Sequence, residues 1–97
     1  MDIIPFMEYY RVRTGTSIFK KSEFPDKFFL IEDGEFSDRL GEGVGEMKTR
    51  GDFLGEISCL LGEDCYFFDV KCEKEGHLWA LPSPLLTIVY KLCSNSR

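Results

Sequence analysis

The stretch YFFDVKCE, residues 66–73, is the clearest indicator of the fold because apolar and polar side chains alternate along most of it. Residues 66, 68, 70 and 72 would line one face, and the residues between them are mostly polar. A period of two is typical of a β-strand with one buried face. Residues 76–81 follow a Glu75-Gly76 turn and are interpreted as a returning strand, so the two segments together predict a hairpin.

Short segments of this kind, rich in aromatic and β-branched residues, recur along the chain between glycines and charged residues. The spacing is typical of an antiparallel sandwich or barrel rather than of a helical bundle. It predicts about eight strands. The candidates are residues 8–12, 17–19, 28–32, 35–40, 45–49, 66–73 and 76–81.

Two helices are expected among these strands. Residues 55–61 carry apolar side chains at helical spacing, and Gly62 follows where a helix would end. The second helix is predicted over residues 83–93, with Ser83 as its cap and Pro84 in its first turn.

Length and composition indicate one folded domain covering residues 1–97. The chain is 43% hydrophobic and 14% aromatic, which is enough to form a core. A net charge of -5 lacks the clustered cations that nucleic acid requires. No stretch reaches the roughly 20 apolar residues of a membrane-spanning helix, and no secretory signal is visible. We therefore expect a cytoplasmic protein without membrane insertion or nucleic-acid binding.

The four cysteines do not form a recognisable metal or disulfide pattern. Cys59, Cys65, Cys72 and Cys93 contain no C-x-x-C pair, and His77 is the single histidine. Four reduced thiols and no metal site are expected. Catalysis is not expected either, because no nucleophile and base stand at a recognisable spacing.

Three motifs occur in an order that resembles the cyclic nucleotide-binding domain. Residues 15–19 are similar to its early glycine and strand, and residues 28–34 to its aromatic-aliphatic strand ending in glycine. Residues 51–56, GDFLGE, match the family motif G-D-x-F-G-E except at Leu54, where phenylalanine is usual. The resemblance covers residues 15–91 and implies a jelly roll with a short cassette helix and a C-terminal helix. The family's final lid helix is expected to be absent from this chain.

The resemblance also implies a ligand pocket. In the family, the motif's glutamate holds the sugar hydroxyl, while the cassette-helix N-terminus and an arginine hold the cyclic phosphate. The corresponding residues in this chain are Gly55, Glu56, Ile57, Cys65 and Tyr66. For Glu56 the alternative is a structural role at the helix start, where negative charge is favourable.

The phosphate half of this implied pocket departs from the family pattern. Cys65 takes the place of the arginine, Asp64 that of a proline, and Tyr66 and Phe67 those of small residues. No Lys or Arg lies between residues 51 and 70. Losing a charge-assisted pair to phosphate costs about 1.5–3 kcal/mol.

We therefore expect a non-catalytic regulatory or interaction module with weak or no cyclic nucleotide binding and no cofactor. Its partner would be another domain or protein of a signalling assembly. The alternative is a genuine sensor of cAMP, cGMP or another small molecule within a larger kinase, exchange factor or channel.

Overall fold

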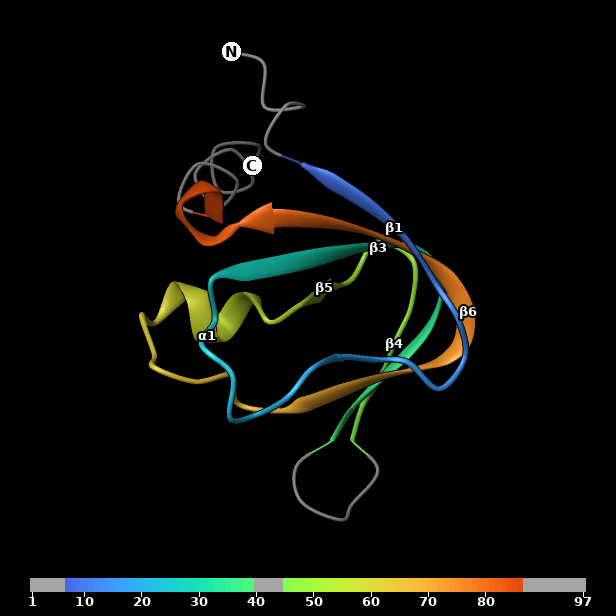
Figure 1. Cartoon of the computed structure of the whole chain (residues 1–97), viewed down its shortest axis with the longest axis horizontal. Coiled ribbons are helices and arrows are strands. Elements are labelled where there is room, and N and C mark those ends of the chain that lie inside the picture. Colours follow the sequence, from blue (N-terminus) through green and yellow to red (C-terminus); the bar gives the residue numbers. More distant parts are fainter. Residues whose placement is uncertain (1–6, 40–44, 87–97) are drawn as a thin grey trace, which may run out of the picture.

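The computed structural model describes residues 7–39 and 45–86 as a mainly β, antiparallel fold (Figure 1). The strands are β1 (Glu8–Val12), β2 (Ser17–Phe19), β3 (Lys27–Arg39), β4 (Met47–Lys48), β5 (Phe53–Leu54) and β6 (Asp69–Pro82). A short helix, α1 (Glu56–Leu60), follows β5, and a 3₁₀ turn, η2 (Ser83–Leu85), follows β6.

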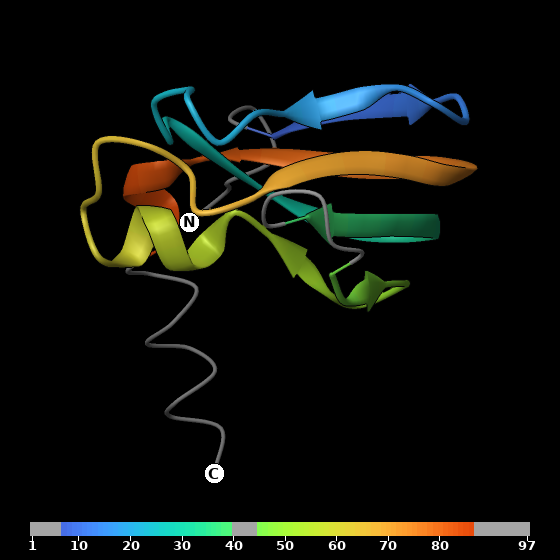
Figure 2. The same cartoon turned by 90° about the horizontal axis from the view of Figure 1, so that it is seen from below.

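The strands pair in the order β1-β6-β3-β4, with β2 added to β6 and β5 added to β3. Every pairing in this part of the chain is antiparallel. Figure 2 shows β1 and β2 on one side of β6, with β3, β5 and β4 on the other. The expected fold class is confirmed.

The two long strands, β3 and β6, bend in the middle, and the bent sheet forms two layers (Figure 1). Each long strand contributes one half to each layer. The first half of β3 pairs with the second half of β6, with Phe28 opposite Leu81. The second half of β3 pairs with the first half of β6, with Ser37 opposite Lys71. Two bent strands thus replace four short predicted ones, and β5 was not predicted. The described residues therefore contain six strands rather than about eight.

The predicted hairpin at Glu75-Gly76 is wrong. The two halves of β6 pair with β3 and not with each other, and β6 itself begins at Asp69 rather than at residue 66. Gly76 lies at the bend against Gly34, where a Cβ on Gly34 would be 2.7 Å from the Gly76 Cα. Apolar and polar residues alternating on both sides of a glycine occur both in a hairpin and in a bent strand. Only the strand with which each half pairs distinguishes the two.

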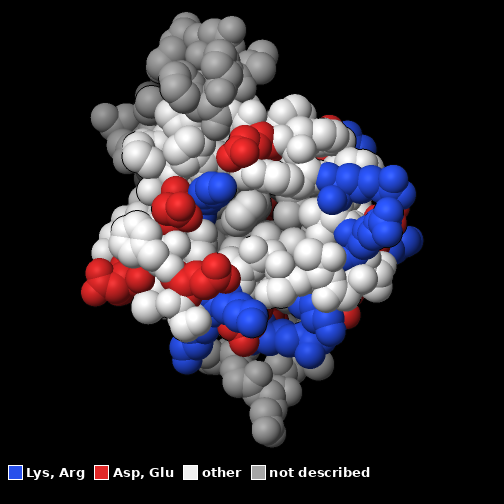
Figure 3. Space-filling model, in the orientation of Figure 1, with Lys and Arg blue, Asp and Glu red and all other residues white. Residues whose placement is uncertain are grey.

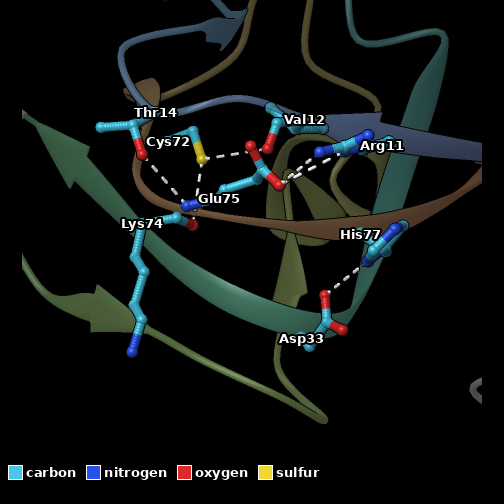
Figure 4. Close-up of polar contacts among 8 residues, drawn as sticks. All are labelled: Arg11, Val12, Thr14, Asp33, Cys72, Lys74, Glu75 and His77. Carbon is cyan, nitrogen blue, oxygen red and sulfur yellow. Dashed lines mark hydrogen bonds and ion pairs between the residues drawn. The ribbon is translucent and has the colours of Figure 1, made fainter.

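Polar contacts hold β1 and its following turn against this bend (Figure 4). The backbone N–H of Glu75 donates to Thr14 Oγ1 at 3.1 Å, and Arg11 forms an ion pair with the Glu75 carboxylate at 2.9 Å. On the other side of the bend, His77 Nδ1 lies 2.8 Å from Asp33 Oδ1. The bend is therefore supported by β1 as well as by β3.

The main core lies between the two layers. Of the predicted inward face, Tyr66, Val70 and Cys72 are buried, at 3%, 2% and 0% exposed. The prediction is wrong for Phe68, which lies before β6 begins and is 36% exposed. The buried members of this core are Val12, Phe19, Phe29, Ile31, Phe36, Leu54, Tyr66, Val70, Cys72, Leu78 and Ala80. A smaller cluster of Phe28, Leu81 and Leu86 packs beside α1 and η2.

The predicted C-terminal helix is described only at its start. The 3₁₀ turn η2 contains Pro84 in its first turn, as expected, but its N-cap is Pro82 rather than Ser83, and no side chain caps it. Residues 87–93 of the predicted helix lie outside the described residues. Within residues 7–39 and 45–86, no helix has the length and apolarity needed to cross a membrane.

Candidate ligand pocket

The GDFLGE motif forms a turn, a short strand and the start of α1. Strand β5 pairs Leu54 with Phe29 of β3, which anchors the motif to the core. Gly55 follows with a φ of 78°, in the left-handed region that favours glycine. A Cβ at this position would also lie 2.8 Å from the Tyr66 ring and 3.2 Å from Phe19. The second glycine of the motif is thus required by both backbone conformation and space.

A cavity of about 290 Å³ lies over the N-terminus of α1. Gly55, Glu56 and Ile57, three of the residues that the family resemblance implied, line it. Phe53 and Phe67 contribute aromatic walls. Since Ile57 also leaves 47% of its surface exposed, the cavity opens to solvent along the helix.

Three carboxylates and one lysine decide the charge of this cavity. Asp38 and Glu46 come from β3 and from the segment before β4, and they join Glu56 in the lining. Lys48 is the one cation among the lining residues that the structure describes, and it lies 3.4 Å from the Glu46 carboxylate. The backbone N–H of Glu46 donates to Asp38 Oδ1 at 2.6 Å, which fixes both residues at the cavity. The pocket therefore carries a net negative charge.

Asp38, Glu46 and Lys48 were missed by sequence reasoning. They lie before the motif and reach the pocket because β3 pairs with β4, with Phe36 opposite Lys48. Nothing in the spacing of residues 51–65 points to them. Only the strand register brings them to α1.

Glu56 is half-buried at the first turn of α1. Burial raises the pKa of its carboxyl group, and its own backbone N–H and that of Ile57 partly offset this effect. The charged form is thus less favoured than in water, even at a helix start. This environment fits a carboxylate that gains from a hydroxyl donor supplied by a ligand.

Cys65 and Tyr66 lie outside the lining of this cavity. Cys65 is exposed on a shallow depression that it shares with Lys21, Glu63 and Asp64. Tyr66 is 3% exposed and belongs to the core. Three of the five predicted site residues therefore line the cavity, and the other two lie outside its lining.

Tyr66 has a structural role in this position. Its ring stacks on Phe19 with centroids 3.8 Å apart, and its hydroxyl donates to the backbone carbonyl of Lys27 at 2.6 Å. Burial raises the pKa of its hydroxyl group. The ring fills the core beneath Gly55 rather than the cavity.

Helix α1 turns its apolar residues outward. Ile57, Leu60 and Leu61 are 47%, 45% and 62% exposed, whereas Ser58 is 2% exposed. Ser58 Oγ accepts the backbone N–H of Phe67 at 3.0 Å and so ties the returning loop to the helix. The helical spacing of these apolar residues predicted the helix but not which face would be buried.

The remaining titratable residues do not gather into a metal site in the described part of the chain. No group of three His, Cys, Asp or Glu side chains suited to a metal ion occurs there. Cys59, Cys65 and Cys72 are free thiols, and Cys93 lies outside the described residues. Burial raises the pKa of Cys59 to about 11.

The sequence of residues 10–91 matches the family model of the cyclic nucleotide-binding domain. The chain therefore belongs to the cyclic nucleotide-binding domain family, a class of jelly-roll regulatory domains.

Individual proteins are also similar to this chain. An uncharacterized protein of Mycobacterium tuberculosis is 35% identical over 71 residues, which is 73% of this chain and 14% of that protein. The chain thus spans a small part of its curated relative. The solved structure of Sp-2Cl-cAMPS bound to PKAR CBD2 is 21% identical, with a TM-score of 0.75 over 94% of this chain and 67% of that one.

A second solved structure is similar in fold. It is the regulatory subunit of a cAMP-independent protein kinase A from Trypanosoma cruzi bound to guanosine. It is 20% identical, with a TM-score of 0.74 over 80% of this chain and 28% of that one. At these identities the structural likeness shows the fold alone.

Proposed function

We propose that this chain is a non-catalytic regulatory or interaction module whose family pocket binds cyclic nucleotides weakly or not at all. The observation that carries the proposal is the charge of the pocket. Asp38, Glu46 and Glu56 line it, and its cation, Lys48, is already paired with Glu46. A cyclic phosphate would lose its hydration there beside three carboxylates, and the one lysine, which is loosely paired with the exposed Glu46, does not offset them.

The absence of the family's arginine supports the same proposal. Cys65 stands at that sequence position, and its thiol faces the carbonyl of Ser22 at 3.8 Å rather than the cavity. Helix α1 offers backbone N–H groups at its N-terminus, but one short helix provides only partial charge. The sugar half of the site, at Glu56, is better preserved than the phosphate half.

A partner domain is part of the proposal. The exposed apolar side chains of α1 and its C-cap, at Ile57, Leu60 and Leu61, form a surface on which a neighbouring domain of a signalling assembly packs. The small share of the Mycobacterium tuberculosis relative that the chain covers is consistent with a module of a larger protein. We place this assembly in the cytoplasm.

Calorimetric titration with cAMP and cGMP, followed in parallel by backbone amide shifts, tests the proposal. We expect no saturation at micromolar ligand and at most small shifts around Gly55 and Glu56. Saturation well below the micromolar range would contradict it.

The second candidate is a small-molecule sensor that uses the same pocket. It is favoured by the cavity of about 290 Å³, which combines aromatic walls with the desolvated Glu56 carboxylate. An uncharged ribonucleoside would use the hydroxyl-binding half without needing the phosphate half. Guanosine, present in the Trypanosoma cruzi structure, is therefore the third ligand for the titration. Guanosine binding with no cyclic nucleotide binding would favour this second function.

A further inference from the structure

A second cavity, of about 530 Å³, lies on the opposite side of β6 from the motif, beneath the β1–β2 connection. Its apolar floor consists of Val12, Ile18, Phe29 and Leu78. It shares no lining residue with the pocket at α1. Its volume falls within the range of roughly 300–1,000 Å³ that is usual for small-molecule sites.

The strand pairing explains why the sheet opens here. Strand β1 pairs with the second half of β6, from Val12 opposite Gly76 to Glu8 opposite Ala80. Strand β2 pairs only with the first half of β6, around Val70, and its register is irregular. The two strands therefore diverge and leave the cavity between them.

The rim of this cavity is basic although the chain has a net charge of -5. Arg11, Arg13 and Lys27 line it, and no Asp or Glu is among the lining residues in the described part of the chain. Basic side chains also gather on the face shown in Figure 3, toward the side where β1 ends. The cavity has the opposite charge preference from the pocket at α1.

Two of the three cations have carboxylate partners outside the lining. Arg11 pairs with Glu75 at 2.9 Å (Figure 4), and Lys27 lies 3.6 Å from Glu8. Both pairs are at least two-fifths exposed, so each holds its geometry weakly. Arg13 has no ion-pair partner among the described residues. A ligand anion can therefore recruit Arg13 directly and compete for Arg11.

We propose that this cavity binds a small amphipathic carboxylate, an unbranched alkyl chain with one anionic head. The alkyl chain lies on the apolar floor, where its burial is favourable. The carboxylate lies at the rim, where a guanidinium group offers two parallel N–H donors. A phosphate without an alkyl chain would use only the rim, and an uncharged alkyl compound only the floor.

The full chain titrated with sodium decanoate, below its micelle concentration, tests this proposal. Decylamine, of equal chain length and opposite charge, and acetate, of equal charge without the chain, are the comparison ligands. We expect saturable binding of decanoate, with amide shifts at Val12, Ile18 and Leu78, and at least about tenfold weaker binding of both others. Equal affinity for decanoate and decylamine would overturn the proposal.

Two arginine variants and one matched control refine the test. Arg11→Gln and Arg13→Gln should each weaken decanoate binding roughly three- to tenfold, as expected for partly exposed ion pairs. Arg50 is an exposed arginine outside the cavity, so Arg50→Gln should change the decanoate affinity by less than about twofold. The assignment of this cavity would also be overturned if neither arginine substitution weakened decanoate binding. Amide shifts centred on Glu56 would overturn it as well. Because the comparison of the three ligands uses the unmodified chain, its outcome does not depend on how the variants fold or on cyclic nucleotide binding.

Discussion

At the scale of single residues, the pocket at α1 is governed by where its charges lie. Glu46 pairs with Lys48 and is also tied to Asp38 through its backbone N–H. It thus occupies the lysine that could otherwise face an anion. Glu63 has the same charge but lies on the depression beside Cys65, away from the cavity.

Removing the Glu46 charge should therefore improve cyclic nucleotide binding. For Glu46→Gln we expect about a two- to fivefold gain in cAMP affinity, because Lys48 is released and one carboxylate is lost. Competition with a fluorescent cyclic nucleotide measures the gain at the weak affinities expected. Glu63→Gln is the matched control and should change the affinity little. Equal gains in the two variants would mean that net charge, and not the pocket, sets the affinity.

Restoring the family's arginine is a separate test. We predict that Cys65→Arg combined with Asp64→Pro raises cAMP affinity at least about tenfold, as a charge-assisted pair to phosphate should. Cys65→Ala should change it little. The added guanidinium must reach past Phe67, which lines the cavity, whereas Tyr66 lies in the core and does not obstruct it. Calorimetry on the unmodified chain and the two variants measures the three cAMP affinities. An unchanged affinity in the double variant would show that Cys65 is not the reason for weak binding.

At the scale of elements, the bends of β3 and β6 determine the architecture. Gly34 and Gly76 bring the two strands into backbone contact at the point where both reverse. A Cβ on Gly76 would overlap the carbonyl oxygen of Asp33. Gly34 in addition has a φ of 92°, so both space and conformation require glycine there.

Alanine substitutions separate these two requirements. Gly15 shares the φ of 92°, but a Cβ on Gly15 would meet no atom within 4 Å. Gly15→Ala should therefore cost about 1 kcal/mol for conformation alone. Gly34→Ala should cost about 3 kcal/mol or more, since a backbone clash is added. Urea unfolding at neutral pH measures both, and similar losses for the two variants would show that the close approach contributes little.

At the scale of the whole molecule, two cavities of opposite charge lie on the two sides of one bent sheet. Carboxylates dominate the cavity at α1, and arginines dominate the one beneath β1 and β2. Separated charges of this kind let an acidic chain attract anions to one place and repel them from another. The integrity of the shared core between them can be followed through its thiols.

Cys72 should react only as the whole fold opens, and the half-buried Cys59 should react slowly. Cys72 is fully buried, and burial raises the thiol pKa of Cys59 to about 11, which leaves little thiolate at neutral pH. Cys65 is exposed and should be alkylated first, at least about tenfold faster. Peptide mapping after timed treatment with a maleimide measures each rate separately, Cys93 included. Equal rates for Cys65 and Cys72 in the folded protein would contradict the described core.

The thiols also allow the prediction of no disulfide and no metal to be tested. Intact mass should be the same with and without reductant, apart from reducible adducts, and no zinc should remain after gel filtration. A stoichiometric disulfide or bound zinc would contradict this prediction.

Local sequence patterns were sufficient to predict the kind of fold and the position of its motif. Alternation and turn residues predicted β1 and β2 at their observed bounds, and residues 55–61 correctly predicted α1. These features depend on local chemistry, namely side-chain periodicity and the backbone freedom of glycine. The order of the motifs likewise indicated the family that residues 10–91 match.

What lies opposite each local element, in contrast, depends on how the whole chain packs. Whether Gly76 makes a turn or a bend depends on Gly34, which lies far from it in the chain. Whether Tyr66 enters the pocket or the core depends on its stacking with Phe19, and Lys48 reaches the pocket through the register of β3 with β4. Contacts between residues far apart in sequence are set by packing and strand register, and a local pattern does not encode them.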